Sequence, residues 1–123
     1  MMKPRIVAID DEKEFAGMLL DYFAIRGYDI GIASRAAPGI EMIKESRPDV
    51  VLCDFKMPGI DGDEILGLTR TLAPAPKVIF VTAYYDGGST RIRLLNMGAY
   101  AYFDKPITSL KALEEAINRS VNG

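Results

Sequence analysis

Residues 50–54 read Val-Val-Leu-Cys-Asp, a block of four apolar residues that ends at an aspartate. A block without alternation of apolar and polar residues is typical of a strand that is covered on both faces. Similar short blocks recur at roughly even intervals, at residues 6–9, 28–33, 78–81 and 99–103. Four of the five blocks are continuous, whereas Asp29 and Gly31 interrupt the second. We therefore predict five strands, the second of them at an edge of the sheet.

The stretches between these blocks have the spacing of amphipathic helices. In the first stretch, Phe15, Met18, Leu19 and Tyr22 recur at i, i+3, i+4 and i+7. Residues that start or stop helices surround these stretches. Gly27 follows the first helix, and Ser34 and Pro48 stand before and after the second. Asp61 and Glu64 resemble a capping box at the start of the third helix, and Gly87 and Gly88 precede the fourth. Strands that alternate with helices in this way build a parallel sheet with helices on both faces.

Length and composition limit the classes of protein. The chain has 123 residues, the size of one ordinary domain, and 49% of them are hydrophobic, which is enough for a packed core. The 15 basic and 17 acidic residues nearly cancel, so the net charge of −2 offers no basic field for nucleic acid. We expect an α/β protein with a single domain and no direct contact with nucleic acid.

The scarcity of histidine and cysteine excludes several kinds of site. Histidine is absent, so Ser-His-Asp systems, Cys-His systems and zinc held by imidazole are all excluded. Cys53 is the single cysteine, which allows no internal disulfide and no cysteine metal cage, as is usual in a reducing compartment. The longest apolar block, residues 99–103, is far shorter than the ~18 residues of a membrane span. We expect a cytoplasmic protein without a membrane partner.

Polar residues that can carry chemistry follow the first, third, fourth and fifth blocks. Ligands of open parallel sheets bind beyond the carboxyl ends of the strands, so these positions are the ones that matter for function. Each residue alone has an ordinary explanation, such as a helix cap, a turn or a surface lysine. Together, however, they would bring three carboxylates, a hydroxyl and an ammonium group to one edge of the sheet. The three carboxylates are those of Asp10 and Asp11 after the first block and Asp54 after the third; the hydroxyl is that of Thr82 after the fourth, and the ammonium group is that of Lys105 after the fifth. Glu12, Asp104 and Pro106 stand next to these residues.

The charges at this edge predict a metal ion. Two carboxylates 4 Å apart repel by ~1 kcal/mol in water and by ~4 kcal/mol at an effective dielectric of 20. Three acids with one lysine therefore require either a raised pKa or a bound cation. Oxygen ligands alone favour Mg²⁺, which keeps coordination positions open for phosphoryl oxygens. With its charge neutralised by the metal and Lys105, Asp54 could attack a phosphoryl group.

The chain resembles the response-regulator receiver domains of two-component signal transduction, over essentially all of residues 1–123. The order and spacing of the shared motifs are specific, although each motif alone is weak evidence. The resemblance implies a flavodoxin-like, doubly wound, five-stranded parallel sheet with strand order 2-1-3-4-5. The motifs are Asp10-Asp11, Asp54 followed by Met57-Pro58-Gly59, Asp61-Gly62, Thr82-Ala83, Gly98-Ala99 and Lys105-Pro106.

The resemblance also implies a role for each site residue. Asp54 would be the phosphorylation site and would accept a phosphoryl group from a sensor histidine kinase or a histidine phosphotransfer protein in a phosphorelay. Asp10, Asp11, Asp54 and the backbone carbonyl of Lys56 would hold Mg²⁺. Thr82 and Lys105 would contact the phosphoryl oxygens. The peptide bond between Lys105 and Pro106 would be cis.

The resemblance further implies a switch made by Thr82 and Tyr102. The new acyl phosphate would draw the Thr82 hydroxyl inward, and the Tyr102 ring would enter the vacated space. The fourth helix and the fifth strand would then repack and change a partner-binding face. The partner would be a downstream protein or a fused output domain, and a homodimer could form through the fourth helix, fifth strand and fifth helix.

Two further positions tune the lifetime of the acyl phosphate in the family. They lie two residues after Asp54 and two after Thr82, where this chain has Lys56 and Tyr84. The bulky Tyr84 ring would screen the phosphoryl group from water and lengthen its lifetime. The alternative for Lys56 is a surface ion pair, which would contribute little.

Two other classes of function remain as alternatives. One is an aspartyl-phosphate phosphatase, an enzyme class that uses a second aspartate two residues after its nucleophile. Lys56 stands there in this chain, so we expect a phosphoacceptor that assists its own phosphorylation and dephosphorylation, without turnover of outside substrates. The other alternative is an interaction module with an inert pocket, which a failure to bind Mg²⁺ would favour.

Overall fold

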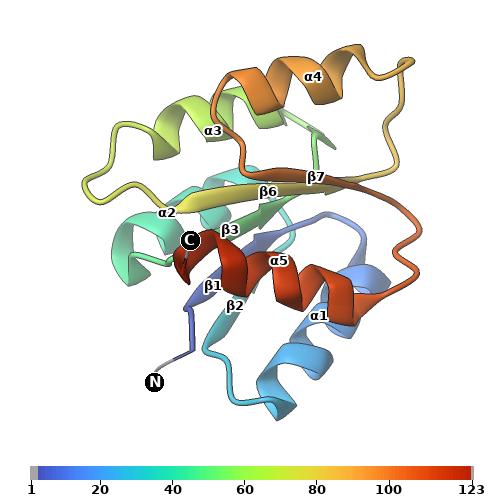
Figure 1. Ribbon diagram of the computed structural model, residues 1–123. Coiled ribbons are helices and arrows are strands. Elements are labelled where there is room, and N and C mark those ends of the chain that lie inside the picture. The colour runs from blue at the N-terminus through green and yellow to red at the C-terminus, as the bar shows by residue number, and fades with distance from the viewer. Residues whose placement is uncertain (1–2, 123) are drawn as a thin grey trace.

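Five parallel strands form the centre of the computed structural model, which describes residues 3–122 (Figure 1). Their order across the sheet is β2-β1-β3-β6-β7, which is the predicted order 2-1-3-4-5 when only these strands are counted. The predicted edge position of the second strand is confirmed. The strands are β1 (Ile6–Ile9), β2 (Ile30–Ala33), β3 (Val50–Cys53), β6 (Lys77–Thr82) and β7 (Ala101–Asp104).

Helices cover both faces of this sheet, as the alternating pattern predicted. Helices α1 (Lys13–Ile25) and α5 (Leu110–Asn122) lie on one face (Figure 1). Helices α2 (Ala36–Ser46), α3 (Gly62–Thr69) and α4 (Ser89–Asn96) lie on the other. Within residues 3–122, no helix has the length and the hydrophobicity that crossing a membrane requires.

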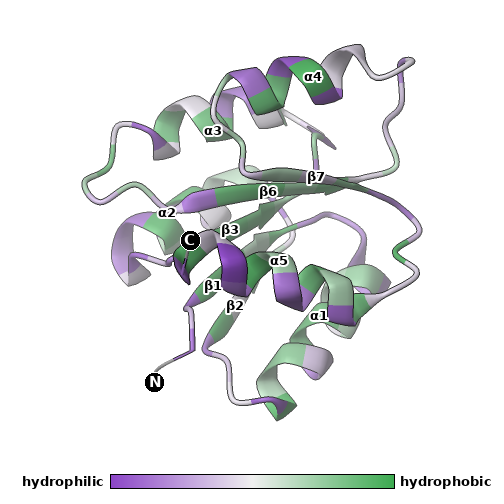
Figure 2. Ribbon diagram, viewed as in Figure 1, coloured by the Kyte–Doolittle hydropathy of each residue, from purple (hydrophilic) through white to green (hydrophobic). Residues whose placement is uncertain are grey.

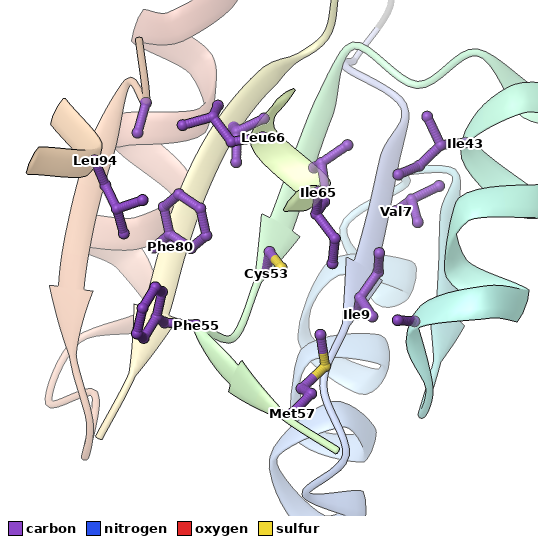
Figure 3. Packing of buried hydrophobic residues seen from close by; sticks show 14 of the residues in the cluster. Val7, Ile9, Ile43, Cys53, Phe55, Met57, Ile65, Leu66, Phe80 and Leu94 are labelled. Carbon is purple, nitrogen blue, oxygen red and sulfur yellow. The ribbon is translucent and has the colours of Figure 1, made fainter. Parts of the chain in front are cut away.

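Each central strand supplies side chains to two separate cores, which explains the continuous apolar blocks. In β1, Ile6 and Ala8 pack under α1 and α5, whereas Val7 and Ile9 pack under α2 and α3. The strands are accordingly hydrophobic along most of their length in Figure 2, except at the start of β6, where Lys77 stands. Figure 3 shows the second of these cores, with Phe80 near Leu94 at one end and Ile9 with Ile43 at the other.

Two of the predicted capping interactions are wrong. The residue that caps α2 is Arg35 and not Ser34, and its side chain makes no capping hydrogen bond. Asp61 does precede α3, but its side chain makes no capping hydrogen bond either. Its carboxylate instead lies 3.8 Å from the Lys56 ammonium group, because the two residues pair in a short hairpin. The predicted stop of α2 at Pro48 is confirmed, since the helix ends at Ser46.

We did not predict the two strands of this hairpin from the sequence. We identified Met57-Pro58-Gly59 only as a shared motif, and the structure forms two antiparallel strands there, β4 (Lys56–Met57) and β5 (Ile60–Asp61). Gly59 has φ +90°, a backbone conformation that favours glycine. The hairpin carries the chain away from Asp54 and back to the start of α3.

Two strands are shorter than their apolar blocks. The second block began at Tyr28, but β2 begins at Ile30, because Tyr28 is buried against the ring of Phe23 before the strand starts. The fifth block began at Ala99, but β7 begins at Ala101. The backbone nitrogen of Ala99 donates to the carbonyl oxygen of Leu94, so Ala99 lies in the turn that closes α4. Tyr28 and Ala99 are hydrophobic because they are buried in the core, although neither belongs to a strand.

Candidate functional site

Asp10 and Asp54 lie side by side because their strands are neighbours in the sheet. Each stands one residue beyond its strand, and the parallel hydrogen-bond ladder continues to it. The backbone nitrogen of Asp10 donates to Ala33 at 3.0 Å, and that of Asp54 donates to Ile9 at 3.1 Å. Both side chains are deeply buried, with 3% and 8% of the residue exposed. The sheet therefore holds two carboxylates at the same level of its carboxyl edge.

Lys105 reaches these carboxylates from the far side of the sheet. Its backbone nitrogen donates to Thr82 at 2.9 Å, which anchors it just after β7. Its ammonium group lies 2.9 Å from Asp10 Oδ2, 3.0 Å from Glu12 Oε1 and 3.3 Å from Asp54 Oδ2. Only 10% of the lysine side chain is exposed. One buried cation thus bridges three acids from two segments of the chain.

The pKa values at this site follow from burial and from the surrounding charges. Burial raises the pKa of the Asp10 carboxyl above its ordinary value, and the hydrogen bond from Lys105 offsets only part of this effect. Burial acts to lower the pKa of Lys105, but its hydrogen bonds to Asp10 and Glu12, with the charges of Asp10 and Asp54, raise the pKa overall. The ammonium group is therefore charged at neutral pH, and the carboxylates outnumber it.

Asp10, Asp11 and Asp54 form an arrangement that fits a small divalent cation. Each of them offers a carboxylate oxygen, and these oxygens all lie within 4.8 Å of one another. Opposite oxygens around Mg²⁺ are about 4.2 Å apart, because each bond is about 2.1 Å long. Small side-chain rotations would bring oxygens that are up to 4.8 Å apart to this spacing of about 4.2 Å. Asp11 is exposed, so the site is open on the solvent side.

Lys56 and Tyr84 lie at the rim of this acidic site. The backbone nitrogen of Lys56 is 3.4 Å from Asp54 Oδ1, while its ammonium group forms the surface ion pair with Asp61. That ammonium group also lies 5.6 Å from the centroid of the Tyr84 ring. The Tyr84 ring in turn packs on Phe55, with centroids 5.0 Å apart. The predicted role of the Lys56 carbonyl as a metal ligand stays a prediction.

Thr82 and Tyr102 are connected through the backbone of residue 84. The nitrogen of Tyr84 donates to the Thr82 hydroxyl oxygen at 3.1 Å. The Tyr102 hydroxyl donates to the carbonyl oxygen of Tyr84 at 3.0 Å. The Tyr102 side chain is already buried in this structure, whereas the sequence predicted a ring that enters after Thr82 moves. The cis peptide bond between Lys105 and Pro106 is confirmed.

Glu12 contacts the site, although we predicted no role for it from the sequence. Its carboxylate holds the Lys105 ammonium group at 3.0 Å, and its backbone nitrogen donates to Asp10 Oδ1 at 2.9 Å. Phe15 was also missed: its ring centroid lies 4.6 Å from the same ammonium group. The position of Glu12 directly after two aspartates was a signal, but it fits a helix start equally well.

A family model described as a response regulator receiver domain matches residues 6–118. Among curated proteins, the chain is similar to sporulation initiation phosphotransferase F of Bacillus subtilis (strain 168). The two are 29% identical over 119 residues, which cover 97% of this chain and 94% of that protein.

Two other relatives are longer proteins. Regulatory protein AtoC of Escherichia coli (strain K12) is 34% identical over 102 residues, covering 83% of this chain and 22% of AtoC. Response regulator MprA of Mycobacterium leprae (strain TN) is 32% identical over 115 residues, covering 94% of this chain and 48% of MprA. The chain thus spans about a fifth of AtoC and about half of MprA.

Solved structures have the same fold. A response regulator receiver domain protein from Clostridium thermocellum superimposes with a TM-score of 0.87 at 30% identity, covering 98% of this chain and 95% of that one. A CheY-like receiver domain protein from Methanospirillum hungatei JF-1 superimposes with a TM-score of 0.85 at 29% identity, covering 99% and 98%.

Proposed function

The chain belongs to the response regulator receiver domains, and on this basis we propose that Asp54 is its phosphorylation site. The chain is a phosphorylation-dependent signalling domain of a two-component system. We propose that all of residues 1–123 form this one domain. The observation that carries the assignment of Asp54 is its position. It is a buried carboxylate between the Lys105 ammonium group and the backbone N–H of Lys56, beside the oxygens of Asp10 and Asp11.

The proposed reaction is transfer of a phosphoryl group to Asp54. A carboxylate oxygen of Asp54 attacks the phosphorus of a phosphohistidine, and the bond between phosphorus and the imidazole nitrogen breaks. The electron pair of that bond leaves with the imidazole, and an acyl phosphate forms on Asp54. The donor is a sensor histidine kinase or a histidine phosphotransfer protein. This chain contains no histidine, so the donor residue must come from the partner.

The charges around Asp54 support this step. Lys105 is charged, buried and 3.3 Å from Asp54 Oδ2, so it can neutralise the transferred group at short range. Asp10, Asp11, Asp54 and the Lys56 carbonyl would hold Mg²⁺, which neutralises carboxylates and phosphoryl oxygens when bound. The Thr82 hydroxyl, at the end of β6, would donate to a phosphoryl oxygen. The three catalytic residues are therefore Asp54, Thr82 and Lys105.

The switch would act through Thr82 and Tyr102. Movement of the Thr82 hydroxyl toward the phosphoryl group would break or stretch its hydrogen bond with the Tyr84 nitrogen. A displaced residue 84 would carry with it the carbonyl that accepts the Tyr102 hydroxyl. These two contacts support a path from the phosphorylation site to β7 and α4.

The face formed by α4, β7 and α5 would read out the switch. Ile92 on α4 and Tyr100 before β7 are large hydrophobic residues that are substantially exposed. We propose that a downstream protein or a fused output domain binds there, and that a homodimer through the same face is the second candidate. We place the domain in the cytoplasm, where its kinase would present the phosphohistidine, and propose no contact with nucleic acid or membrane.

Turnover of outside substrates is not part of the proposal. In aspartyl-phosphate phosphatases an aspartate stands two residues after the nucleophile. Here the equivalent Lys56 points its ammonium group to Asp61 and the Tyr84 ring. An ammonium group has no free electron pair with which to act as a general base. Multiple turnovers on a small phosphate ester would contradict this part of the proposal.

Intact-mass measurement after incubation with Mg²⁺ and acetyl phosphate tests the phosphorylation site. We expect the wild-type protein to gain one phosphoryl unit, and Asp54→Asn to gain none. Asp21→Asn, a change of the same kind at an exposed site on α1, should gain it like the wild type. Circular dichroism would verify that each variant is folded. Labelling of a folded Asp54→Asn protein, or no labelling of the wild type, would refute the assignment.

A further inference from the structure

A cavity lies at the edge of the sheet opposite to the acidic site of Asp54. Its walls come from the end of α2, just before β3 begins, and from the segment between α3 and β6. It therefore opens at the amino ends of these parallel strands, away from the acidic site. Its volume is about 210 Å³. The lining residues are Ile43, Lys44, Arg47, Pro48, Leu72, Pro74 and Pro76.

The inner surface of this cavity is apolar and stiff. Ile43 is fully buried and Leu72 is half-buried. Prolines form much of the remaining wall, and a proline has no backbone N–H group to offer and a fixed φ angle. Such a wall gives little hydrogen bonding to a polar guest, and it resists collapse into the space. The body of a ligand should accordingly be apolar.

Two cations stand at the mouth of the cavity. Lys44 and Arg47 are exposed, and no carboxylate within residues 3–122 approaches either of them to 4.0 Å. The Arg47 guanidinium group spans the mouth and donates one long hydrogen bond, of 3.5 Å, to the carbonyl oxygen of Ala73. The lining includes no acidic residue, although the whole chain carries a net charge of −2. This mouth is therefore complementary to an anion.

The backbone keeps Arg47 at this position. Its φ is +49°, and among the described residues it is the one non-glycine residue with positive φ. Residues other than glycine, asparagine and aspartate adopt this conformation uncommonly. The backbone nitrogen of Arg47 donates to Ile43 at 3.0 Å and closes the last turn of α2. From this position the guanidinium group reaches the segment between α3 and β6, where it donates to the carbonyl oxygen of Ala73.

We propose that this cavity binds a small carboxylic acid with a compact apolar body, such as an arylacetate or a branched aliphatic acid. An engineered apolar cavity of ~150 Å³ in another protein holds benzene, so one ring with a short carboxylate arm is the matching size. The ring would lie against Ile43, Leu72 and the prolines. The carboxylate would remain at the mouth, where Arg47 offers a fork of donors and Lys44 a second charge.

A titration with phenylacetate followed by amide NMR shifts tests this proposal, with phenylacetamide as the neutral analogue. We expect saturable shifts confined to residues 43–48 and 71–77. Phenylacetate should bind at least about tenfold more tightly than phenylacetamide, the factor that one charge-assisted hydrogen bond supplies. The proposal does not depend on phosphorylation, so no Mg²⁺ or phosphodonor is added.

Two variants and one matched control complete the test. Arg47→Gln and Lys44→Gln should each weaken phenylacetate binding severalfold and leave phenylacetamide binding unchanged. Arg35→Gln, at the other end of α2, should bind like the wild type. Shifts that are scattered or never saturate, equal binding of the two probes, or full affinity in both variants would overturn the proposal. Shifts that depend on protein concentration alone would also overturn it, because they would assign the cavity to contact between copies.

Discussion

At the residue scale, Tyr84 is the side chain that we predict to control access of water to Asp54. Its ring packs on Phe55, the residue directly after Asp54, with centroids 5.0 Å apart. The Lys56 ammonium group lies 5.6 Å from the centroid of the Tyr84 ring. The backbone of Tyr84, and not its ring, makes the hydrogen bonds to Thr82 and Tyr102. The ring can therefore be removed without removing those bonds.

We expect Tyr84→Ala to shorten the lifetime of the acyl phosphate by roughly tenfold, which corresponds to ~1.4 kcal/mol of activation free energy. The physical reason is that the truncated side chain leaves a path for a water molecule to the phosphorus. Loss of radiolabelled phosphate from the purified phosphoprotein measures the rate. The adjacent Tyr85→Ala is the matched control, because 76% of Tyr85 is exposed and its loss should leave the rate unchanged. An unaltered rate in Tyr84→Ala would contradict the screening role.

At the scale of elements, one carboxylate joins α5 to the region where α1 ends. Glu114 on α5 accepts hydrogen bonds from the hydroxyls of Tyr22 at 2.9 Å and Tyr28 at 2.8 Å. The guanidinium group of Arg26 lies 3.2 Å from the same carboxylate. Burial acts to raise the pKa of Glu114, but the two hydroxyls and the charge of Arg26 outweigh it and lower the pKa below 4.5.

This lowered pKa predicts how the stability depends on pH. A carboxyl whose pKa is lower in the folded state stabilises that state above its unfolded pKa, and the effect is lost as the pH falls through the folded value. We expect Glu114→Gln to lower the free energy of unfolding by about 1–2 kcal/mol at pH 7. The difference from the wild type should shrink as the pH falls below 4.5.

Urea denaturation at several pH values measures this difference, and the neighbouring Glu115→Gln serves as control. Glu115 is exposed on the same helix, so its substitution should change stability little at any pH. A Glu114→Gln deficit that stayed constant from pH 7 to pH 3 would show that the carboxylate charge is not the cause.

At the scale of the whole molecule, the parallel sheet concentrates negative charge at one edge. Every strand ends at that edge, so Asp10, Asp11 and Asp54 meet there, and the Lys105 ammonium group contacts Asp10, Glu12 and Asp54. Gathering these acids opposes folding, because burial makes ionisation of Asp10 unfavourable. A divalent cation that binds only the folded protein should relieve this cost.

We therefore expect Mg²⁺ to raise the melting temperature by several degrees, since a ligand at 100 times its Kd stabilises by about 2.7 kcal/mol. Addition of EDTA should reverse the shift. Thermal unfolding by circular dichroism measures it without any phosphodonor. Asp11→Asn should abolish most of the increase, whereas Asp21→Asn on the surface of α1 should retain it. An equal increase in both variants would place the cation elsewhere.

Much of the fold was predictable because its signals are local. The continuous apolar blocks reflect burial on two faces, and the helix spacing between them reflects burial on one. Chain order then constrained the topology, since parallel strands need long crossovers. The same reasoning placed Asp10, Asp54, Thr82 and Lys105 at strand ends. In the structure, the Lys105 ammonium group contacts the carboxylates of Asp10 and Asp54, and its backbone nitrogen donates to Thr82.

Other features depended on contacts between distant residues, which no local pattern contains. Glu12 contacts an ammonium group 93 residues away, and Asp61 pairs with Lys56 across a hairpin instead of capping α3. The burial of Tyr102 and the cavity beside Arg47 likewise exist only where separate segments pack together. Sequence alone determined the alternating elements, the parallel sheet and the acids at its edge, because hydrophobic periodicity is written along the chain. Tertiary packing decided the partner of each charged group, because that choice depends on distances set by the assembled molecule.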